Sequence, residues 1–227
     1  THVDLAYHSE HTYQVRSRNA DGYSEWSEKQ TFQSAEDPWK DTPKPQSITW
    51  TGTLYGNHSA DLAFDQAFQQ SDGGFHSGGD ALGQTLTVDY GKAYKLDKIE
   101  YYPRTDAGNG TVTKMKLETS LDGVHWSEAK EYNWDRNAET KVMDKLNCGA
   151  RYIRFTPLAA LGNFFSASEI KVYKEADSTA FAVGSTNGSE TVSEADYTNM
   201  KNYLGVGGDD KIFIEQIKSR YGDINMN

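Results

Sequence analysis

The chain has 227 residues and a formal net charge of −10, with 36% hydrophobic and 12% aromatic residues. Nucleic-acid phosphates and anionic lipids repel an acidic chain, so nucleic acid is excluded as an expected partner. Apolar runs are only a few residues long, which excludes a transmembrane segment. The one cysteine, Cys148, rules out an internal disulfide and a cysteine-based metal site. Residue 1 is Thr rather than Met, and we expect it to be an internal position of a longer protein.

Residues 1–36 have the alternation and turn signals of short strands. Tyr13 and Val15 share one strand face, and Asn-Ala-Asp-Gly at 19–22 predicts a tight turn. The run 13–27 resembles the last two strands of a fibronectin type III domain, with Tyr13 at its tyrosine-corner position. Because a whole domain of that kind has about 100 residues, we expect a partial fibronectin type III-like segment.

Proline and small residues mark two linkers. Residues 37–47 hold three of the five prolines, which predicts a stiff linker, and residues 176–192 are rich in Ser, Thr, Gly and Ala. Between the linkers, 48–175 is the largest unit. Its strand-like runs lie at 85–90, 96–102, 112–120, 151–157 and 168–173, without a sustained helical period. The sequence therefore predicts an all-β fold, a β-sandwich of about eight strands.

Several motifs of this unit follow one another in a characteristic order. They are Ala63-Phe64-Asp65, Phe75-His76-Ser77, Leu86-x-Val88-Asp89-Tyr90-Gly91, Tyr102-x-Arg104 with Asn109-Gly110, Ser120-x-Asp122-Gly123-x-x-Trp126, Ala150-Arg151-Tyr152-Ile153-Arg154-Phe155 and Ser168-Glu169-Ile170. In this order they resemble discoidin domains, also called coagulation factor 5/8 type C domains. Residues 48–175 most resemble the family 32 carbohydrate-binding modules of secreted bacterial glycoside hydrolases. The resemblance implies a jelly-roll-like sandwich. Animal discoidin domains usually close with a disulfide, so one cysteine favours the bacterial type.

The resemblance implies a sugar-binding role for His76, Arg104 and Asn109. A pyranose offers hydroxyls that donate and accept hydrogen bonds, and one apolar face. The imidazole offers a ring nitrogen, the guanidinium a fork for two neighbouring hydroxyls, and the amide both a donor and an acceptor. In galactose-binding relatives these residues bind the sugar, including its axial 4-hydroxyl. The implied ligand is a glycan ending in galactose or N-acetylgalactosamine. The alternative is an ordinary surface arginine, a turn asparagine and a hydrogen-bonded rim histidine.

Several residues are candidates for the aromatic side chain that stacks on the apolar face of the sugar. Many relatives carry a tryptophan three residues after the histidine, where this chain has Gly79. Phe164 or Phe165, in the loop before the last strand, is the replacement candidate, and we expect one of the two to fill the core. Trp50 and Tyr55 are further candidates.

The resemblance also implies one structural calcium ion. Calcium prefers carboxylate and carbonyl oxygens, and Asp65 and Glu169 match the two side-chain ligands of the family. Ser71 or Asp72 stands in place of the usual threonine. The alternative is that Asp65 caps a turn and Glu169 is a solvated strand residue.

Residues 193–227 predict a short α-helical segment and a truncated calcium loop. Ser193 is the expected N-cap, with Asp196 at the capping-box position. The tail 222–227 resembles the start of a dockerin repeat without the later ligands of a 12-residue loop. A coincidental polar tail is the alternative. Together the resemblances imply part of a large secreted, cell-surface or periplasmic bacterial glycosidase. They also imply a parent catalytic domain in cis and a cohesin-like partner for the complete tail.

The two alternative function classes are an enzyme and an adhesion module. The sequence has no His-Glu-x-x-His, Gly-x-Ser-x-Gly or phosphate-loop motif, and no carboxylate pair for glycoside hydrolysis can be identified, so the region is expected to be non-catalytic. A protein- or lipid-binding adhesion module is the second class, because the apolar run 158–165 resembles a membrane spike. The net charge of −10 opposes binding to anionic lipid.

Overall fold

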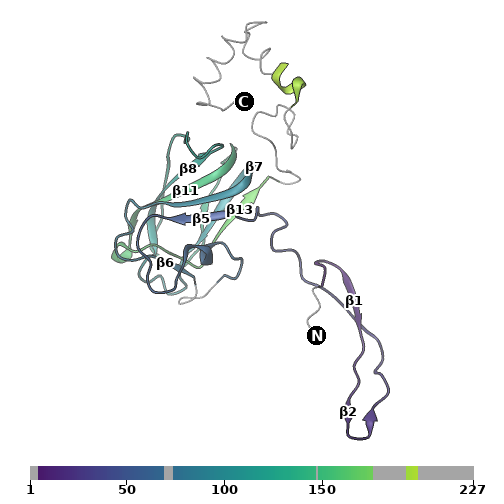
Figure 1. The fold of residues 1–227 in the computed structure, drawn as a ribbon. Helices are drawn as coiled ribbons and strands as arrows, with labels where there is room; N and C mark the ends of the chain where they lie inside the picture. The colour runs from purple at the N-terminus through teal and green to yellow at the C-terminus, as the bar shows by residue number, and fades with distance from the viewer. Residues whose placement is uncertain (1–4, 69–73, 147, 176–192, 199–227) are drawn as a thin grey trace. The chain divides into compact units, whose positions relative to one another are not determined.

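The computed structural model describes residues 5–68, 74–146, 148–175 and 193–198. The chain divides into two compact units, Thr1–Lys40 and Asp41–Asn227. In the first unit, β1 (Glu10–Tyr13) pairs antiparallel with β4 (Gln30–Gln33), and β2 (Arg18–Asn19) pairs with β3 (Gly22–Tyr23) across the predicted turn (Figure 1). Gly22 has a φ of 133°, a conformation that other residues rarely adopt.

The aromatic side chains of the first unit are largely exposed. Tyr13, Tyr23 and Trp26 are each about half accessible to solvent. The guanidinium of Arg16 lies over the rings of Tyr23 and Trp26, at 3.9 and 4.4 Å from their centroids. Local hydrogen bonds and cation–π contacts therefore hold this hairpin, rather than a buried core.

The second unit is built from one network of seven strands and one short ladder. The network contains β5 (Ser47–Trp50), β7 (Leu86–Tyr102), β8 (Val112–Ser120), β9 (Lys130–Asn133), β10 (Lys141–Met143), β11 (Cys148–Ala160) and β13 (Glu169–Lys174). The ladder pairs β6 (Phe75–His76) with β12 (Ser166–Ala167), and two 3₁₀ turns, η1 (Ala60–Ala63) and η2 (Leu161–Asn163), complete it. The predicted all-β sandwich is confirmed.

The long strand β7 is the centre of this network (Figure 1). Its first residues, from Leu86 to Asp89, pair with β5 on one edge and β11 on the other. Its last residues pair with β10 and β13. The change of partners falls around Gly91, which has a φ of 73°, and opposite a register shift in β11 between Ala150 and Tyr152. β7 therefore contributes hydrogen bonds to both halves of the sandwich.

Alternating apolar residues of these strands form the core. Side chains without exposed surface include Leu86, Val88, Leu96, Ile99, Tyr101, Met115, Met143, Ile153, Phe155, Phe165 and Val172. Tyr101 carries the one polar atom among these side chains, and its hydroxyl donates to the Ser166 carbonyl at 2.7 Å. That bond ties the β6–β12 ladder to the C-terminal end of β7, next to the loop that follows this strand.

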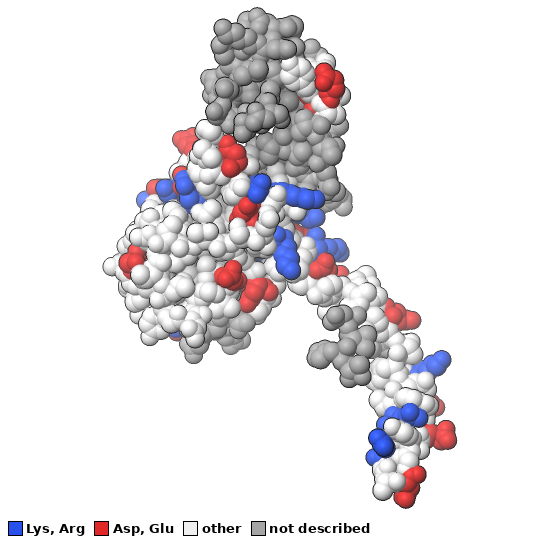
Figure 2. All heavy atoms as spheres, in the orientation of Figure 1, with Lys and Arg blue, Asp and Glu red and all other residues white. Residues whose placement is uncertain are grey.

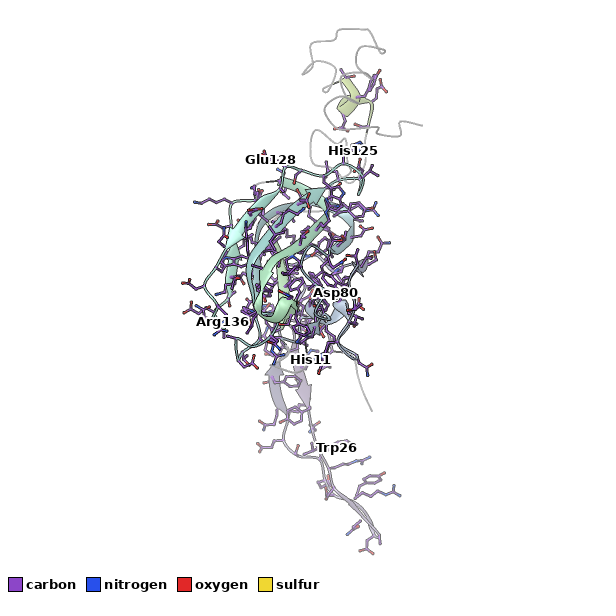
Figure 3. All side chains as sticks on the ribbon, turned by 90° about the vertical axis from the view of Figure 1, so that its left-hand side faces the viewer. His11, Trp26, Asp80, His125, Glu128 and Arg136 are labelled. Atoms are coloured by element: carbon purple, nitrogen blue, oxygen red, sulfur yellow. The ribbon has the colours of Figure 1, made fainter. Side chains whose placement is uncertain are left out.

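The surface of the second unit mixes both charge signs. Figure 2 shows basic and acidic side chains next to one another on the visible face, and Lys98 pairs with Glu100 at 2.6 Å. The predicted hairpin turn after β8 is also present. Asp122 accepts the backbone N–H groups of Val124 and His125 at 2.8 Å each, and the His125 ring at 2.7 Å (Figure 3). Among the described residues, no helix is long and apolar enough to cross a membrane.

The described part of the C-terminal segment is one helical turn over residues 194–198. The predicted cap is present in part. The backbone N–H and the hydroxyl of Ser193 both donate to Asp196 Oδ2, at 2.8 and 2.7 Å. The predicted dockerin-like residues 222–227 and the linker 176–192 lie outside the described residues.

Candidate functional site

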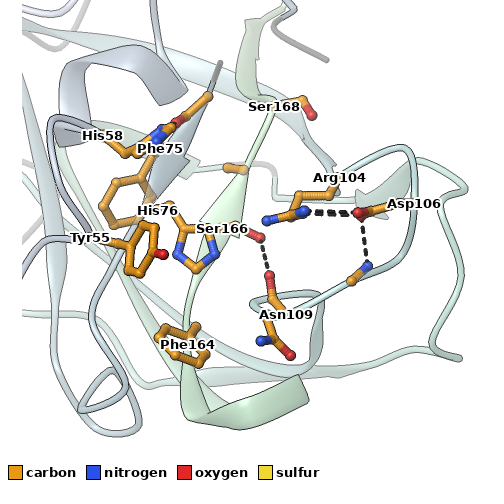
Figure 4. A pocket seen from close by; sticks show the side chains of 13 residues that line it. Tyr55, His58, Phe75, His76, Arg104, Asp106, Asn109, Phe164, Ser166 and Ser168 are labelled. Carbon is orange, nitrogen blue, oxygen red and sulfur yellow. Dashed lines mark hydrogen bonds and ion pairs between the residues drawn. The ribbon is translucent and has the colours of Figure 1, made fainter. Parts of the chain in front are cut away.

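A pocket of about 420 Å³ opens where the β6–β12 ladder meets the loop that follows β7. It is lined by Tyr55, His58, Gly74, Phe75, His76, Arg104, Asp106, Gly108, Asn109, Phe164, Ser166, Ala167 and Ser168. In Figure 4, Tyr55 lies on one side of His76, and Arg104 and Asn109 lie on the other. Four of the five predicted sugar-binding residues therefore come together here: His76, Arg104, Asn109 and Phe164.

Phe165, the fifth predicted residue, lies in the core. Its side chain has no exposed surface, and its ring centroid lies 5.2 Å from that of Phe75 and 6.1 Å from that of Tyr101. A ring without exposed surface cannot stack on a ligand, so the assignment of Phe165 to the site was wrong. Trp50 also packs edge-on against Phe75 and Phe165 and does not line the pocket.

His76 offers an acceptor nitrogen to the pocket. It sits on β6, is 9% exposed, and its Nδ1 lies 2.9 Å from the Ser77 carbonyl. A carbonyl only accepts hydrogen bonds, so Nδ1 carries the proton and Nε2 is the acceptor in the neutral ring. Burial lowers the pKa of His76 below 6.5, and the positive charge of Arg104 lowers this pKa further. The ring is therefore neutral near pH 7.

Arg104 is oriented by a bidentate ion pair. Its Nε and Nη2 donate to the two carboxylate oxygens of Asp106, at 3.0 and 2.8 Å (Figure 4). Asp106 Oδ1 also accepts the Gly108 N–H at 2.8 Å. The hydrogen bonds from Arg104 lower the pKa of Asp106 to about 2, so this carboxylate stays charged. The planar fork of Arg104 is thereby fixed at the pocket wall before any ligand arrives.

Asn109 is held by its backbone, which leaves its amide for other contacts. The Asn109 carbonyl accepts the Ser166 hydroxyl at 3.1 Å. The next residue, Gly110, has a φ of 89°, and a Cβ there would approach Ser166 Oγ to 2.5 Å. The Asn-Gly pair therefore lets the loop lie directly against β12. The side-chain amide of Asn109 makes no hydrogen bond with any described residue.

Phe164 provides the aromatic surface of the pocket. Its half-buried ring stands edge-on to His76, with centroids 5.2 Å apart. A Cβ placed on Gly79 would lie 3.6 Å from the Phe164 ring. The missing side chain at Gly79 thus leaves room beside Phe164. The apolar run 158–165 is not an exposed spike, because Leu158, Leu161 and Phe164 are half-buried and Phe165 is fully buried.

Three lining residues extend the predicted set. Asp106 and His58 were missed, and Tyr55 was only a further candidate. The segment around Tyr55 is held next to β6 by a Tyr55 N–H bond to the His76 carbonyl, at 2.9 Å, and by a bridge between Leu54 and Ser77. This pairing joins residues about twenty positions apart, and no motif in the sequence marks it. The sequence signal for Asp106 was its negative charge, two residues after Arg104.

A second polar feature lies at the start of β13. Glu169 has no exposed surface. Its carboxylate lies against the backbone N–H groups of Phe68 and Gln66, but these contacts fall outside normal hydrogen-bond geometry. Burial raises the pKa of Glu169 to about 8, and the negative charge of Asp65 contributes to the rise. The prediction that Glu169 could be a solvated strand residue is excluded. A buried carboxylate whose oxygens lack a hydrogen bond of normal geometry, next to a second carboxylate, fits the oxygen donor set that calcium takes.

The loop after η1 contains two residues with a left-handed backbone conformation. Gln66 and Phe68 have φ values of 61° and 47°, which cost energy in residues other than glycine. Asp65 accepts the Ala67 N–H at 2.8 Å. Ser71 and Asp72, the predicted further ligands, lie outside the described residues. Within the described part of the chain, no group of three or more His, Cys, Asp or Glu side chains gathers to hold a metal.

The fold and pocket define a class of protein, a discoidin-type β-sandwich with a polar and aromatic pocket. The chain belongs to the F5/8 type C domain family, whose model matches residues 46–170.

Solved structures of family 32 carbohydrate-binding modules from Clostridium perfringens are similar to this chain. The module of NanJ, in complex with galactose, shares 30% identity and a TM-score of 0.52, covering 59% of this chain and 99% of that one. CpGH89CBM32-5, in complex with GalNAc-β-1,3-galactose, shares 28% identity and a TM-score of 0.50, covering 56% and 94%. CBM32-1 of a family 31 glycoside hydrolase shares 27% identity and a TM-score of 0.55, covering 61% and 100%.

A curated protein is also similar over part of its length. It is the A type blood N-acetyl-α-D-galactosamine deacetylase of Flavonifractor plautii, 27% identical over 95 residues. The match covers 41% of this chain, and this chain spans 12% of the length of that relative.

Proposed function

We propose that this chain is a non-catalytic carbohydrate-binding region that recognises glycans ending in a galacto-configured sugar, galactose or N-acetylgalactosamine. The observation that carries the proposal is the convergence of four groups in one open pocket: the acceptor nitrogen of His76, the fixed fork of Arg104, the amide of Asn109 and the ring of Phe164. Two neighbouring modules were solved with galactose or a galactose-containing disaccharide.

The chemistry of the pocket matches such a sugar. The guanidinium is a donor only, the neutral imidazole nitrogen an acceptor only, and the amide is both, so adjacent hydroxyls can be bound in a fixed order. An axial 4-hydroxyl leaves the opposite face of the ring as a continuous apolar C–H surface, which an aromatic ring can cover. Glucose, with an equatorial 4-hydroxyl, presents a different pattern to the same groups.

The expected affinity is weak. A shallow pocket leaves much of the sugar in water, so we expect a Kd between roughly 10 μM and 1 mM, or about −7 to −4 kcal/mol. Attachment to a larger protein compensates by raising the effective concentration of the module near its glycan. We propose that the larger protein is a secreted or surface-bound bacterial glycoside hydrolase, that residues 1–36 are part of a fibronectin type III domain, and that the tail belongs to a dockerin with a cohesin-like partner.

We also propose a structural calcium ion held by Asp65 and Glu169, with backbone carbonyls of the loop after η1 as further ligands. The support is the buried Glu169 carboxylate, which has no hydrogen-bond partner of normal geometry among the described residues. The ion would neutralise two adjacent carboxylates and fix the loop, without taking part in any reaction.

Isothermal titration calorimetry of the full chain with galactose, N-acetylgalactosamine and glucose tests the main proposal. We expect the first two sugars to bind in the stated range, and glucose to bind at least tenfold more weakly. If a glycan array and calorimetry detect no galacto-configured ligand at millimolar concentration, the proposed function is wrong.

A further inference from the structure

The pocket has a second wall that the groups described so far do not use. Tyr55 and His58 lie across the pocket from Arg104 and Asn109 (Figure 4). The Tyr55 ring is 5.2 Å from that of His76 and 6.3 Å from that of His58. Tyr55 is 59% exposed, a large exposed fraction for an aromatic residue that lines a pocket. The opposite wall is charged and polar, whereas this one is aromatic.

The hydrogen-bonding capacity of this wall is also defined. His58 Nδ1 lies 2.9 Å from the Gly74 carbonyl, so Nδ1 carries the proton and Nε2 is an acceptor in the neutral ring. Neither this nitrogen nor the Tyr55 hydroxyl has a hydrogen bond to a described residue. The wall therefore presents an aromatic face, one ring acceptor, and one hydroxyl that can donate or accept.

The pocket has room for more than a bare sugar ring. Its volume is about 420 Å³, whereas a cavity of about 150 Å³ accommodates a benzene molecule. A pyranose bound by Arg104, Asn109 and Phe164 would therefore leave space on the side of Tyr55 and His58.

We propose that Tyr55 and His58 select sugars that carry an acetamido group, so that the preferred ligand of this pocket is N-acetylgalactosamine rather than galactose. The inference rests on the proposed function. An acetamido group supplies an N–H for His58 Nε2, a carbonyl for the Tyr55 hydroxyl, and a planar amide and methyl group for the Tyr55 ring. A hydroxyl at the same position would leave the aromatic face uncovered.

The test is calorimetric titration of the full chain with N-acetylgalactosamine and with galactose. We expect the wild-type protein to prefer the acetamido sugar about tenfold, which corresponds to about 1.4 kcal/mol. Tyr55→Ala and His58→Ala should lower the affinity for N-acetylgalactosamine more than that for galactose, which brings the ratio of the two affinities close to one. Tyr55→Phe should keep most of the preference. Tyr7→Ala, which removes an equally exposed tyrosine of the first unit, is the matched control.

The outcomes separate this inference from the proposed function. If the wild-type protein binds both sugars equally, Tyr55 and His58 do not select the acetamido sugar, while the proposed function stands. If Tyr55→Ala, folded by circular dichroism, loses both sugars alike, Tyr55 is a general platform and the inference is again wrong. If wild-type protein binds neither sugar, the proposed function fails and the inference fails with it.

Discussion

The pocket and the Asp65–Glu169 region are both polar, but they differ in how their polar groups can be satisfied. In the pocket, Arg104 is paired with Asp106 and His76 is bonded to a carbonyl, so water can satisfy the groups that remain. Glu169 is sealed from solvent, and its oxygens have no hydrogen bond of normal geometry among the described residues. Water can satisfy the free polar groups of the pocket, whereas the buried carboxylate of Glu169 requires a bound partner such as a cation.

The difference suits the pocket to ligand recognition and the Asp65–Glu169 region to stabilising the fold. A ligand that visits an exposed pocket changes the folded state little, so substitutions there should affect binding and not folding. A cation bound to a buried carboxylate is present throughout the life of the folded state, so its removal should affect folding first. The four predictions below test whether the two regions separate in this way.

The largest effect is expected from Arg104→Ala. The change removes at least two charge-assisted hydrogen bonds, each worth about 1.5–3 kcal/mol, so binding of galacto-configured sugars should weaken more than about 100-fold and vanish in calorimetry. Arg104→Lys should not restore it, because a point charge cannot replace the fork. The melting temperature should stay nearly unchanged, and Arg136→Ala, an exposed arginine outside the pocket, is the control (Figure 3). Wild-type affinity in Arg104→Ala would place the sugar elsewhere.

Removal of calcium should have the opposite profile. At a free calcium concentration about a hundredfold above the Kd, calcium binding stabilises the folded state by about 2.7 kcal/mol. EDTA should therefore lower the melting temperature by about 10 °C. Glu169→Gln should abolish this response to calcium, and Glu128→Gln, at an exposed position, should leave it intact. Differential scanning calorimetry with and without calcium measures both. A melting temperature that is the same in EDTA and in calcium would refute the proposed ion.

Phe164→Ala is expected to weaken sugar binding about tenfold without changing stability by much. The half-buried ring supplies the apolar surface of the pocket, and its loss removes stacking worth about 1 kcal/mol or slightly more. Phe164→Tyr keeps the ring and should bind like the wild-type protein. Calorimetry with galactose measures the loss. If Phe164→Ala binds as well as Phe164→Tyr, another aromatic residue covers the sugar.

The smallest effect is a pH dependence of binding through His76. Its lowered pKa keeps Nε2 an acceptor at pH 7, and acid converts Nε2 to a donor and adds positive charge near Arg104. We expect the affinity for galactose to be highest near pH 7 and to fall as the pH is lowered through the pKa of His76, which lies below 6.5. The charged and titratable groups facing His76 are His58, Arg104 and Asp106.

A matched pair of variants isolates that effect. His125→Gln, which changes a histidine in the hairpin turn after β8, should keep the wild-type pH profile. His58→Gln should keep the fall in affinity as well. A profile that is flat in the wild-type protein would show that His76 does not accept a hydrogen bond from the ligand.

The fold and half of the site could be predicted from sequence because the relevant signals are local. The strand signal of the run 112–120 is local, and β8 has these bounds. His76, Arg104 and Asn109 stand in motifs with fixed spacing. Phe164 and Phe165 could not be separated, because they follow an irregular turn, η2, where no periodic pattern decides which ring points inward.

Other features depend on pairing between distant segments. His58 reaches the pocket because its ring bonds to the Gly74 carbonyl, sixteen residues further on. The burial of Glu169 likewise depends on the loop after η1, about a hundred residues earlier. Neither relation has a local sequence signal. Asp106 follows Arg104 by two positions, but two residues so close in a loop can point in any relative direction.

The position of β7 also has a consequence for how the domain folds. This strand hydrogen-bonds with β5, β10, β11 and β13, so four of the seven ladders described in the second unit cannot form without it. None of the four partners is adjacent to β7 in the chain, and β13 pairs with β7 about 70 residues away. Loop-closure entropy must be overcome before such contacts stabilise the chain, which makes folding slow, on the scale of milliseconds to seconds. During synthesis β7 emerges after β5 but long before β11 and β13, so the edge segments that pair with these later strands remain unpaired, and open to association with other chains, until the last strand has left the ribosome.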